Sequence, residues 1–198
     1  MDEASRQRLG EKKKWVQAQQ EVITQSKQLA DWWLPTLQLV RQSGIEWKLE
    51  YFNCITGLSY TNWQNQLQHE PWLSAEPHKL ILKEQASFYV HDNVLERYPN
   101  RYPLRYFPQL SFTPSLSSNT DQQVLTEAFQ QLGLKDEPVY FFFMRLPPVL
   151  VLQFSDLVKL AGNGLLPSLE DICITPPNYD WLIFRSLEDE WQFGKRQS

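Results

Sequence analysis

The sequence predicts an α+β protein with a long N-terminal helical segment, a mostly antiparallel sheet and short helices. Three observations support this fold class. Residues 3–42 carry apolar side chains at helical spacing, residues 45–52 alternate between apolar and charged side chains, and no regular βαβ alternation follows. We therefore expect a single domain over residues 1–198, in which the helical segment 1–42 packs on a sheet domain formed by residues 45–198.

The N-terminal segment carries one apolar stripe with spacings of seven, seven, three, four and three residues. It is formed by Val16, Ile23, Ala30, Trp33, Leu37 and Val40. Such spacing places these side chains on one helical face. Pro35 predicts a kink or a new helix start within the segment. Packing on the sheet is the expected role, and an exposed oligomerisation helix is the alternative.

Residues 45–52, IEWKLEYF, predict a half-buried strand because apolar and charged residues alternate at period two. Thr61-Asn62-Trp63-Gln64 has the capping-box pattern and predicts a short helix to Gln68. Two further β-like runs lie near residues 80–83 and 87–91.

Two helices are predicted in the second half of the chain. A capping box at Thr120–Gln123 starts the first, and Gly133 ends it. Ser155-Asp156 is predicted to cap the second, which Gly162 closes.

Five strands are predicted around these helices, and the apolar run PVYFFFMRL at 138–146 is expected to be central in the sheet. The others are 149–154, 171–175, 180–185 and 190–193. The last two are expected to form a hairpin across residues 186–189.

The net charge of −4 opposes binding of the whole molecule to nucleic acid or to an anionic membrane. The sequence begins MDEASRQRLGEKKKW, without an apolar signal core, and no apolar run approaches the roughly 20 residues of a membrane helix. The expected location is the cytoplasm, with no membrane partner.

The sequence offers no recognisable catalytic constellation, cofactor loop or metal site. His69, His78 and His91 are expected at the surface or in loops, because they lack the spacing of zinc ligands. Cys54 and Cys173 lie in apolar runs, which predicts buried and unreactive free thiols. An enzyme of unrecognised type stays open as an alternative.

A repeated Arg-Tyr pair is the main basic feature, in the stretch RYPNRYPLRYFP at 97–108. Its members are Arg97, Arg101 and Arg105 with Tyr98, Tyr102 and Tyr106. Nucleic-acid binding by tyrosine stacking and arginine–phosphate contact is one hypothesis. In an extended chain, however, a spacing of four places arginines and tyrosines on opposite faces. The stretch then predicts an edge element whose tyrosines pack on the core, and nucleic-acid binding becomes the alternative.

A run of three acids, Glu188, Asp189 and Glu190, occupies the predicted hairpin turn, with Trp181 and Trp191 on either side. Exposed aromatic rings beside acids would suit a protein interface. These five residues are the candidate partner-binding site.

Residues 155–191 run from a short helix through a Gly/Pro turn to Asp-x-x-Ile, a proline, Trp181 three residues before Phe184, and the acids. This layout, about a fifth of the chain, resembles the C-terminal end of small cytoplasmic bacterial proteins of the immunity or uncharacterised type. The resemblance implies a non-enzymatic protein that binds and neutralises a toxin. Together with the acidic balance and the 14 % aromatic content, it favours an inhibitor that blocks a basic active site.

Overall fold

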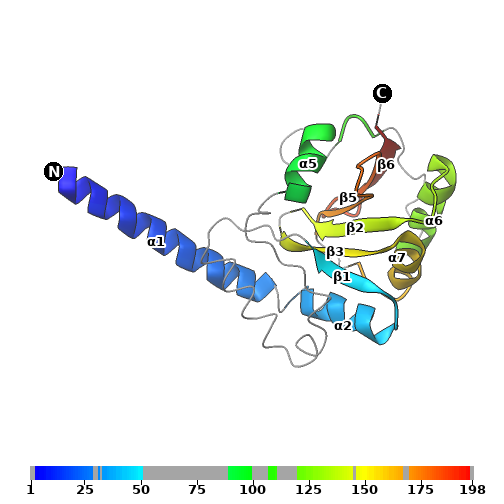
Figure 1. Cartoon of the computed structure of the whole chain (residues 1–198), viewed down its shortest axis with the longest axis horizontal. Coiled ribbons are helices and arrows are strands. Elements are labelled where there is room, and N and C mark those ends of the chain that lie inside the picture. Colours follow the sequence, from blue (N-terminus) through cyan, green and yellow to red (C-terminus); the bar gives the residue numbers. More distant parts are fainter. Residues whose placement is uncertain are drawn as a thin grey trace.

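A computed structural model describes residues 3–28, 31, 33–50, 89–99, 107–110, 120–144, 146–166 and 170–196. Within these ranges the chain forms five helices and one antiparallel sheet of six strands, which confirms the predicted α+β class (Figure 1). The strand order is β1-β3-β2-β4-β5-β6. The strands are β1 (Trp47–Glu50), β2 (Pro138–Phe143), β3 (Leu146–Gln153), β4 (Ile172–Thr175), β5 (Trp181–Arg185) and β6 (Trp191–Lys195).

Strand β2 is central, as the apolar run predicted, because it pairs with β3 on one side and β4 on the other. Its side chains alternate between two buried layers. Val139, Phe141 and Phe143 contribute to one core cluster. Tyr140 and Phe142 contribute to a second cluster on the opposite face.

The first face of the sheet is covered by three helices: α2 (Leu34–Gln42), α6 (Asp121–Leu132) and α7 (Phe154–Ala161) (Figure 1). Trp33 anchors the start of α2 in this layer, and its ring centroid lies 4.8 Å from that of Phe143. The second face is covered by α5 (Tyr89–Arg97) together with residues 107–110. The sheet therefore lies between two layers of cover.

The capping box at Thr120 forms as predicted and fixes the first turn of α6. The Thr120 hydroxyl accepts a hydrogen bond from the Gln123 backbone N–H at 3.3 Å, and Gln123 Oε1 accepts one from the Thr120 N–H at 2.9 Å. Gly133 ends the helix in the left-handed conformation, with φ of 56°, which glycine adopts without steric cost.

The start of α7 differs from the prediction, because the N-cap residue Gln153, just before the helix, makes no side-chain cap and Ser155 lies inside the first turn. The carboxylate of Asp136 replaces the predicted local cap. It accepts hydrogen bonds from the Ser155 N–H and hydroxyl, each at 2.9 Å. A residue 19 positions away in the sequence thus satisfies a donor at this helix end.

The region around residues 87–91 was predicted to be extended, and this is wrong for the part that the structure describes. Residues 89–97 form helix α5, in which Val90 and Val94 are one turn apart and both are buried against the sheet. The helix predicted at 61–68 and the strand at 80–83 lie outside the described residues.

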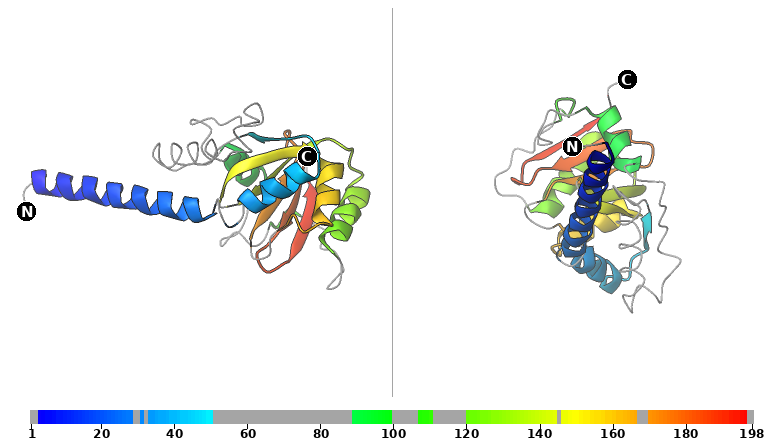
Figure 2. Two further views of the ribbon diagram at one scale, coloured as in Figure 1. Left: turned by 90° about the horizontal axis from the view of Figure 1, so that it is seen from below. Right: turned by 90° about the vertical axis from the view of Figure 1, so that its left-hand side faces the viewer.

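The N-terminal segment behaves as two separate helices. Pro35 lies in the first turn of α2, and the buried residues Trp33, Leu37 and Val40 confirm the second half of the predicted stripe. Helix α1 (Glu3–Gln28) does not pack on the sheet and instead extends away from it (Figures 1 and 2). Leu9, Trp15 and Val16 are 59 %, 61 % and 51 % exposed. The prediction that residues 1–42 pack on the sheet as a unit is therefore wrong for α1.

Replacing Thr120 by alanine should lower the free energy of unfolding by about 1 kcal/mol, because the cap of α6 is lost. Thr120→Ser keeps the hydroxyl and should lie close to the wild type. Urea denaturation of the three proteins measures the difference. Equal midpoints for the alanine and serine variants would contradict the role of the cap.

Candidate functional site

The predicted hairpin of β5 and β6 is present, and its turn is held by backbone and serine hydrogen bonds. The Ser186 N–H donates to the Glu190 carbonyl at 2.9 Å, and the Asp189 N–H donates to the Ser186 carbonyl at 3.0 Å. The Ser186 hydroxyl oxygen accepts from the N–H groups of Glu188 and Glu190, each at 3.2 Å. Asp189 has a φ of 62°, a left-handed conformation that aspartate tolerates better than most residues.

The turn is also tied to the neighbouring strand. The Leu187 N–H donates to Asp171 Oδ1 at 3.0 Å, and Asp171 is buried just before β4. The Asp171 carbonyl accepts from the Met144 N–H at 2.9 Å, at the end of β2. The turn is thus connected through Asp171 to the centre of the sheet.

The five predicted partner-binding residues divide into two groups. Glu188, Asp189 and Glu190 are exposed on the turn. Trp181 and Trp191 are only 3 % and 8 % exposed, so the expectation of exposed aromatic rings beside the acids is wrong. The reason is strand parity, since both tryptophans face the layer of α6 and α7.

The two tryptophans have structural contacts instead. Trp181 Nε1 donates to Glu137 Oε1 at 3.2 Å, and its ring meets that of Phe154 edge-on at 5.6 Å between centroids. Trp191 lies beneath the Arg185 guanidinium, whose carbon is 5.8 Å from the ring centroid. Both tryptophans stabilise the hairpin through core contacts. The exposed groups of the turn are the three acids.

Arg185 lies at the base of the turn and is 2 % exposed. Its Nη1 donates to Asp121 Oδ2 at 3.3 Å, and its Nε lies 3.7 Å from Asp189 Oδ1. A buried guanidinium requires such partners, because an unpaired buried charge is strongly destabilising. Arg185 therefore links the turn to the first residue of α6.

The titration of Asp121 reflects this position. Burial raises the pKa of Asp121 above its ordinary value, the Arg185 charge opposes that shift, and the nearby Asp189 adds to it. Sequence patterns did not identify Arg185 as part of the site. The available signal was its place in WLIFR, where strand alternation assigns it the same face as Trp181 and Ile183.

The Arg-Tyr stretch is described at residues 97–99 and 107–108, and the predicted edge strand is wrong at its beginning because Arg97 is the last residue of α5. Tyr98 is buried, as expected for a tyrosine on the core, and its hydroxyl donates to the Tyr179 carbonyl at 3.0 Å. The Arg97 guanidinium lies 4.6 Å from the Tyr179 ring centroid and donates to Asn93 Oδ1 at 2.5 Å. Both residues are thus engaged within the molecule.

The other four residues of that hypothesis, Arg101, Tyr102, Arg105 and Tyr106, lie outside the described residues. Burial, together with the nearby Asp180 charge, raises the pKa of Tyr98 to about 12. Tyr98 is therefore a core residue that also fixes the loop before β5.

The Cys173 thiol and the His91 imidazole, two groups considered in the sequence analysis, both lie on the second face of the sheet. Cys173 is a buried free thiol, as predicted, and burial raises its pKa well above the ordinary value. His91 was expected at the surface, but it is only 4 % exposed, and its Nε2 lies 3.2 Å from the Phe143 carbonyl oxygen. His69, His78 and Cys54 lie outside the described residues.

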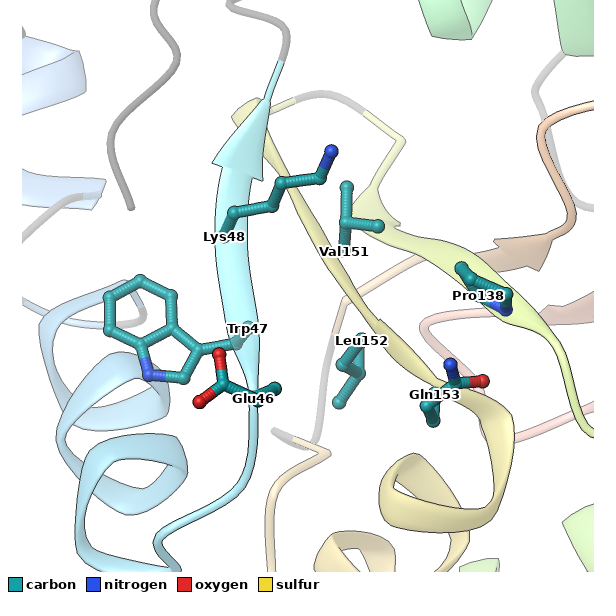
Figure 3. A pocket seen from close by; sticks show the side chains of 7 residues that line it. All are labelled: Glu46, Trp47, Lys48, Pro138, Val151, Leu152 and Gln153. Carbon is teal, nitrogen blue, oxygen red and sulfur yellow. The ribbon is translucent and has the colours of Figure 1, made fainter. Parts of the chain in front are cut away.

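A cavity of about 290 Å³ lies beside β1, at the edge of the sheet opposite to β6 (Figure 3). It is lined by Glu46, Trp47, Lys48, Pro138, Val151, Leu152 and Gln153. This lining contains no serine, threonine, cysteine or histidine, so it offers no pairing of a nucleophile with an imidazole base. The Lys48 ammonium is directed to Glu50 Oε1, 3.1 Å away.

Comparison with protein-family models, with curated proteins and with solved structures finds no match for this chain. Within the described ranges, no group of three or more His, Cys, Asp or Glu residues is arranged to hold a metal ion. None of the helices described combines the length and apolar character that crossing a membrane requires. The acidic turn, with Arg185 and Ser186 beneath it, is the candidate site that the geometry defines best.

Replacing Ser186 by alanine should lower the free energy of unfolding by about 1–3 kcal/mol, because two backbone donors lose their acceptor. Ser155→Ala is the control, since the Ser155 hydroxyl makes one exposed bond to Asp136. Urea denaturation compares the two variants. A loss for Ser186→Ala no larger than that for Ser155→Ala would show that the hydroxyl does not hold the turn.

Acid should destabilise the protein through His91. Burial lowers its pKa from 6.5 to about 4, whereas the unfolded chain keeps the ordinary value. The unfolded state therefore binds more protons between these pH values, and stability rises with pH across this window and levels off above it. The expected contribution is about 3 kcal/mol. Urea unfolding of the wild type and of His91→Gln is measured from pH 4 to 7. Because glutamine does not titrate in this range, the difference between the two proteins gives the contribution of His91. Identical pH dependence in both proteins would contradict the assignment.

Proposed function

We propose that this chain is a non-enzymatic protein-binding protein of the immunity type, which neutralises a toxin in the bacterial cytoplasm by steric and electrostatic blocking. The observation that carries the proposal is the acidic turn. Three exposed carboxylates are presented on a turn whose backbone is held by Ser186 and Asp171, with the buried Arg185 beside the Asp189 side chain.

Preorganisation supports this role, because a turn already fixed in the free protein loses little conformational freedom when a partner binds. The hydrogen bonds of Ser186 hold the backbone of both Glu188 and Glu190. All three acids are exposed on the turn, and Asp189 Oδ1 also lies 3.7 Å from Arg185 Nε, which uses part of the Asp189 charge within the molecule. We assign the direct contacts to Glu188 and Glu190, because both are exposed and Ser186 holds their backbone N–H groups.

Charge supports a basic partner surface. Outside α1 the chain carries 20 acidic against 13 basic residues. Close charge pairs across protein interfaces contribute about 1.5–7 kcal/mol in measured cases, and complementary charge accelerates association. Toxins that act on nucleic acid often present basic active sites, which would complement the acidic turn. The resemblance of residues 155–191 to immunity-type proteins agrees with such a target.

The direct test is co-expression of this chain with the product of the adjacent gene in the native host. We expect a stoichiometric complex and loss of the toxicity of that product. Absence of any stoichiometric protein partner, both from co-expression and from pull-down in the native host, would overturn the proposal.

The Glu188→Lys/Glu190→Lys double variant should weaken the complex at least about tenfold, with most of the effect lost in high salt. Asp92→Lys/Glu96→Lys on α5 is the matched control, because it changes the net charge equally at two exposed positions. Titration calorimetry at two salt concentrations measures both. Equal weakening by the two double variants would show that net charge, and not the turn, determines binding.

A further inference from the structure

Helix α1 exposes apolar side chains although nothing in the fold requires it to do so. Every α1 side chain whose exposure the structure describes is exposed, including Leu9, Trp15 and Val16. The helix extends away from the sheet in Figure 1 and in the left view of Figure 2. Its stability therefore cannot come from packing on the described body of the protein.

An isolated helix with this composition is poorly stabilised in water. Most helical stability in proteins comes from packing of an apolar face, and β-branched residues and glycine lower the intrinsic preference. Helix α1 contains Gly10, Val16, Val22, Ile23 and Thr24 within its 26 residues. A helix of this length and sequence is expected to need a covering partner.

The apolar residues of α1 repeat at intervals of seven. Leu9, Val16 and Ile23 form one row, and Trp15 and Val22 form an adjacent row. An apolar residue at every seventh position is one half of the pattern by which helices pair into a left-handed supercoil. The position three residues after each member of the first row is polar, namely Lys12, Gln19 and Ser26. We call the line of contact between two paired helices the seam. Polar residues in the seam weaken the association of the helices but favour one specific register.

The row is also self-complementary when reversed. If a second α1 runs antiparallel with a two-fold axis at Val16, Leu9 of each copy lies opposite Ile23 of the other. The row of Leu9, Val16 and Ile23 therefore matches its own reverse.

Charge selects the antiparallel orientation. Arg6, Arg8 and Lys12–Lys14 are concentrated in the N-terminal half of α1, whereas residues 15–28 contain only Glu21 and Lys27 as charged residues. A parallel pair would bring the two basic halves together. An antiparallel pair instead places each basic half beside a half of zero formal net charge.

We propose that α1 is a self-association helix that pairs antiparallel with α1 of a second copy of this chain around Val16. The proposal is independent of the acidic turn, which lies on a different part of the molecule. The polar positions of the seam predict reversible association that depends on protein concentration and is strengthened by salt, because the pair is cationic.

The first test is the mass of the full chain in solution by analytical ultracentrifugation over a range of concentrations. We expect twice the 23.5 kDa chain mass at high concentration, and the monomer for Val16→Glu. Gln17→Glu is the matched control, because it introduces the same charge at a neighbouring exposed position, about 100° round the helix from Val16 and on the side away from Trp15 and Val22, and it should remain dimeric.

A wild type that stays monomeric at every concentration, or a Val16→Glu variant that dimerises like the control, would overturn the proposal. Loss of folding is checked by denaturation of the sheet domain, which should be unchanged in both variants. The fate of toxin binding is measured separately on Val16→Glu, so a failure of self-association is distinguished from a failure of the acidic turn.

The orientation is tested by a spin label at Ser5→Cys in a Cys54→Ser background. In the antiparallel pair the two labelled positions are separated by 22 residues along the helices, or about 33 Å. A parallel pair would place them at about the interhelical distance of 8–10 Å. The longer distance supports the proposal, and the shorter one overturns it.

Discussion

The strand β2 imposes the main constraint on this fold, because it is apolar on both faces. Its three phenylalanines are completely buried, with Phe141 and Phe143 in one layer and Phe142 in the other. Each such side chain contributes about 1.5–3 kcal/mol when it is removed from water. Neither face of the sheet can therefore be left to solvent, and the two covering layers follow from this requirement. Helices α2, α6 and α7 meet it on one side, and α5 with residues 107–110 meets it on the other.

The acidic turn depends on the same layers. Arg185 continues the inward-facing row of β5 beyond Trp181 and Ile183, so the parity that builds the core also buries a guanidinium. The position of its partner Asp121 is set by the Thr120 cap, since Asp121 is the first residue of α6. The turn is connected to the core by this ion pair on one side and by the Asp171–Leu187 hydrogen bond on the other. A surface feature of three acids is in this way determined by contacts between distant parts of the chain.

Local signals in the sequence predicted much of the fold, and long-range pairing explains most of the errors. The α6 cap, the central β2 run and the β5–β6 hairpin depend on residues close in the sequence, and all three are confirmed. The error at α5 arose because Tyr89, Val90 and His91 suit a strand, whereas the helical pairing of Val90 with Val94 extends beyond that run. Trp181 and Trp191 were predicted to be exposed but are buried, because α6 and α7 cover their face of the hairpin, and the local sequence does not indicate which face is covered. The Arg185–Asp121 pair joins residues 64 positions apart, which no local pattern indicates.

The apolar stripe of the N-terminal segment also shows what a local sequence pattern leaves undetermined. Periodicity defines an apolar face but does not identify what covers it. The described core covers the stripe from Trp33 onward, whereas Val16 stays exposed. An antiparallel pair centred on Val16 would direct the two bodies to opposite ends, with the two Gln28 residues about 36 Å apart along the axis. At that separation the helix pair would not place one body against the acidic turn of the other. Self-association through a basic helix and capture of a basic partner by an acidic turn are therefore compatible within one molecule.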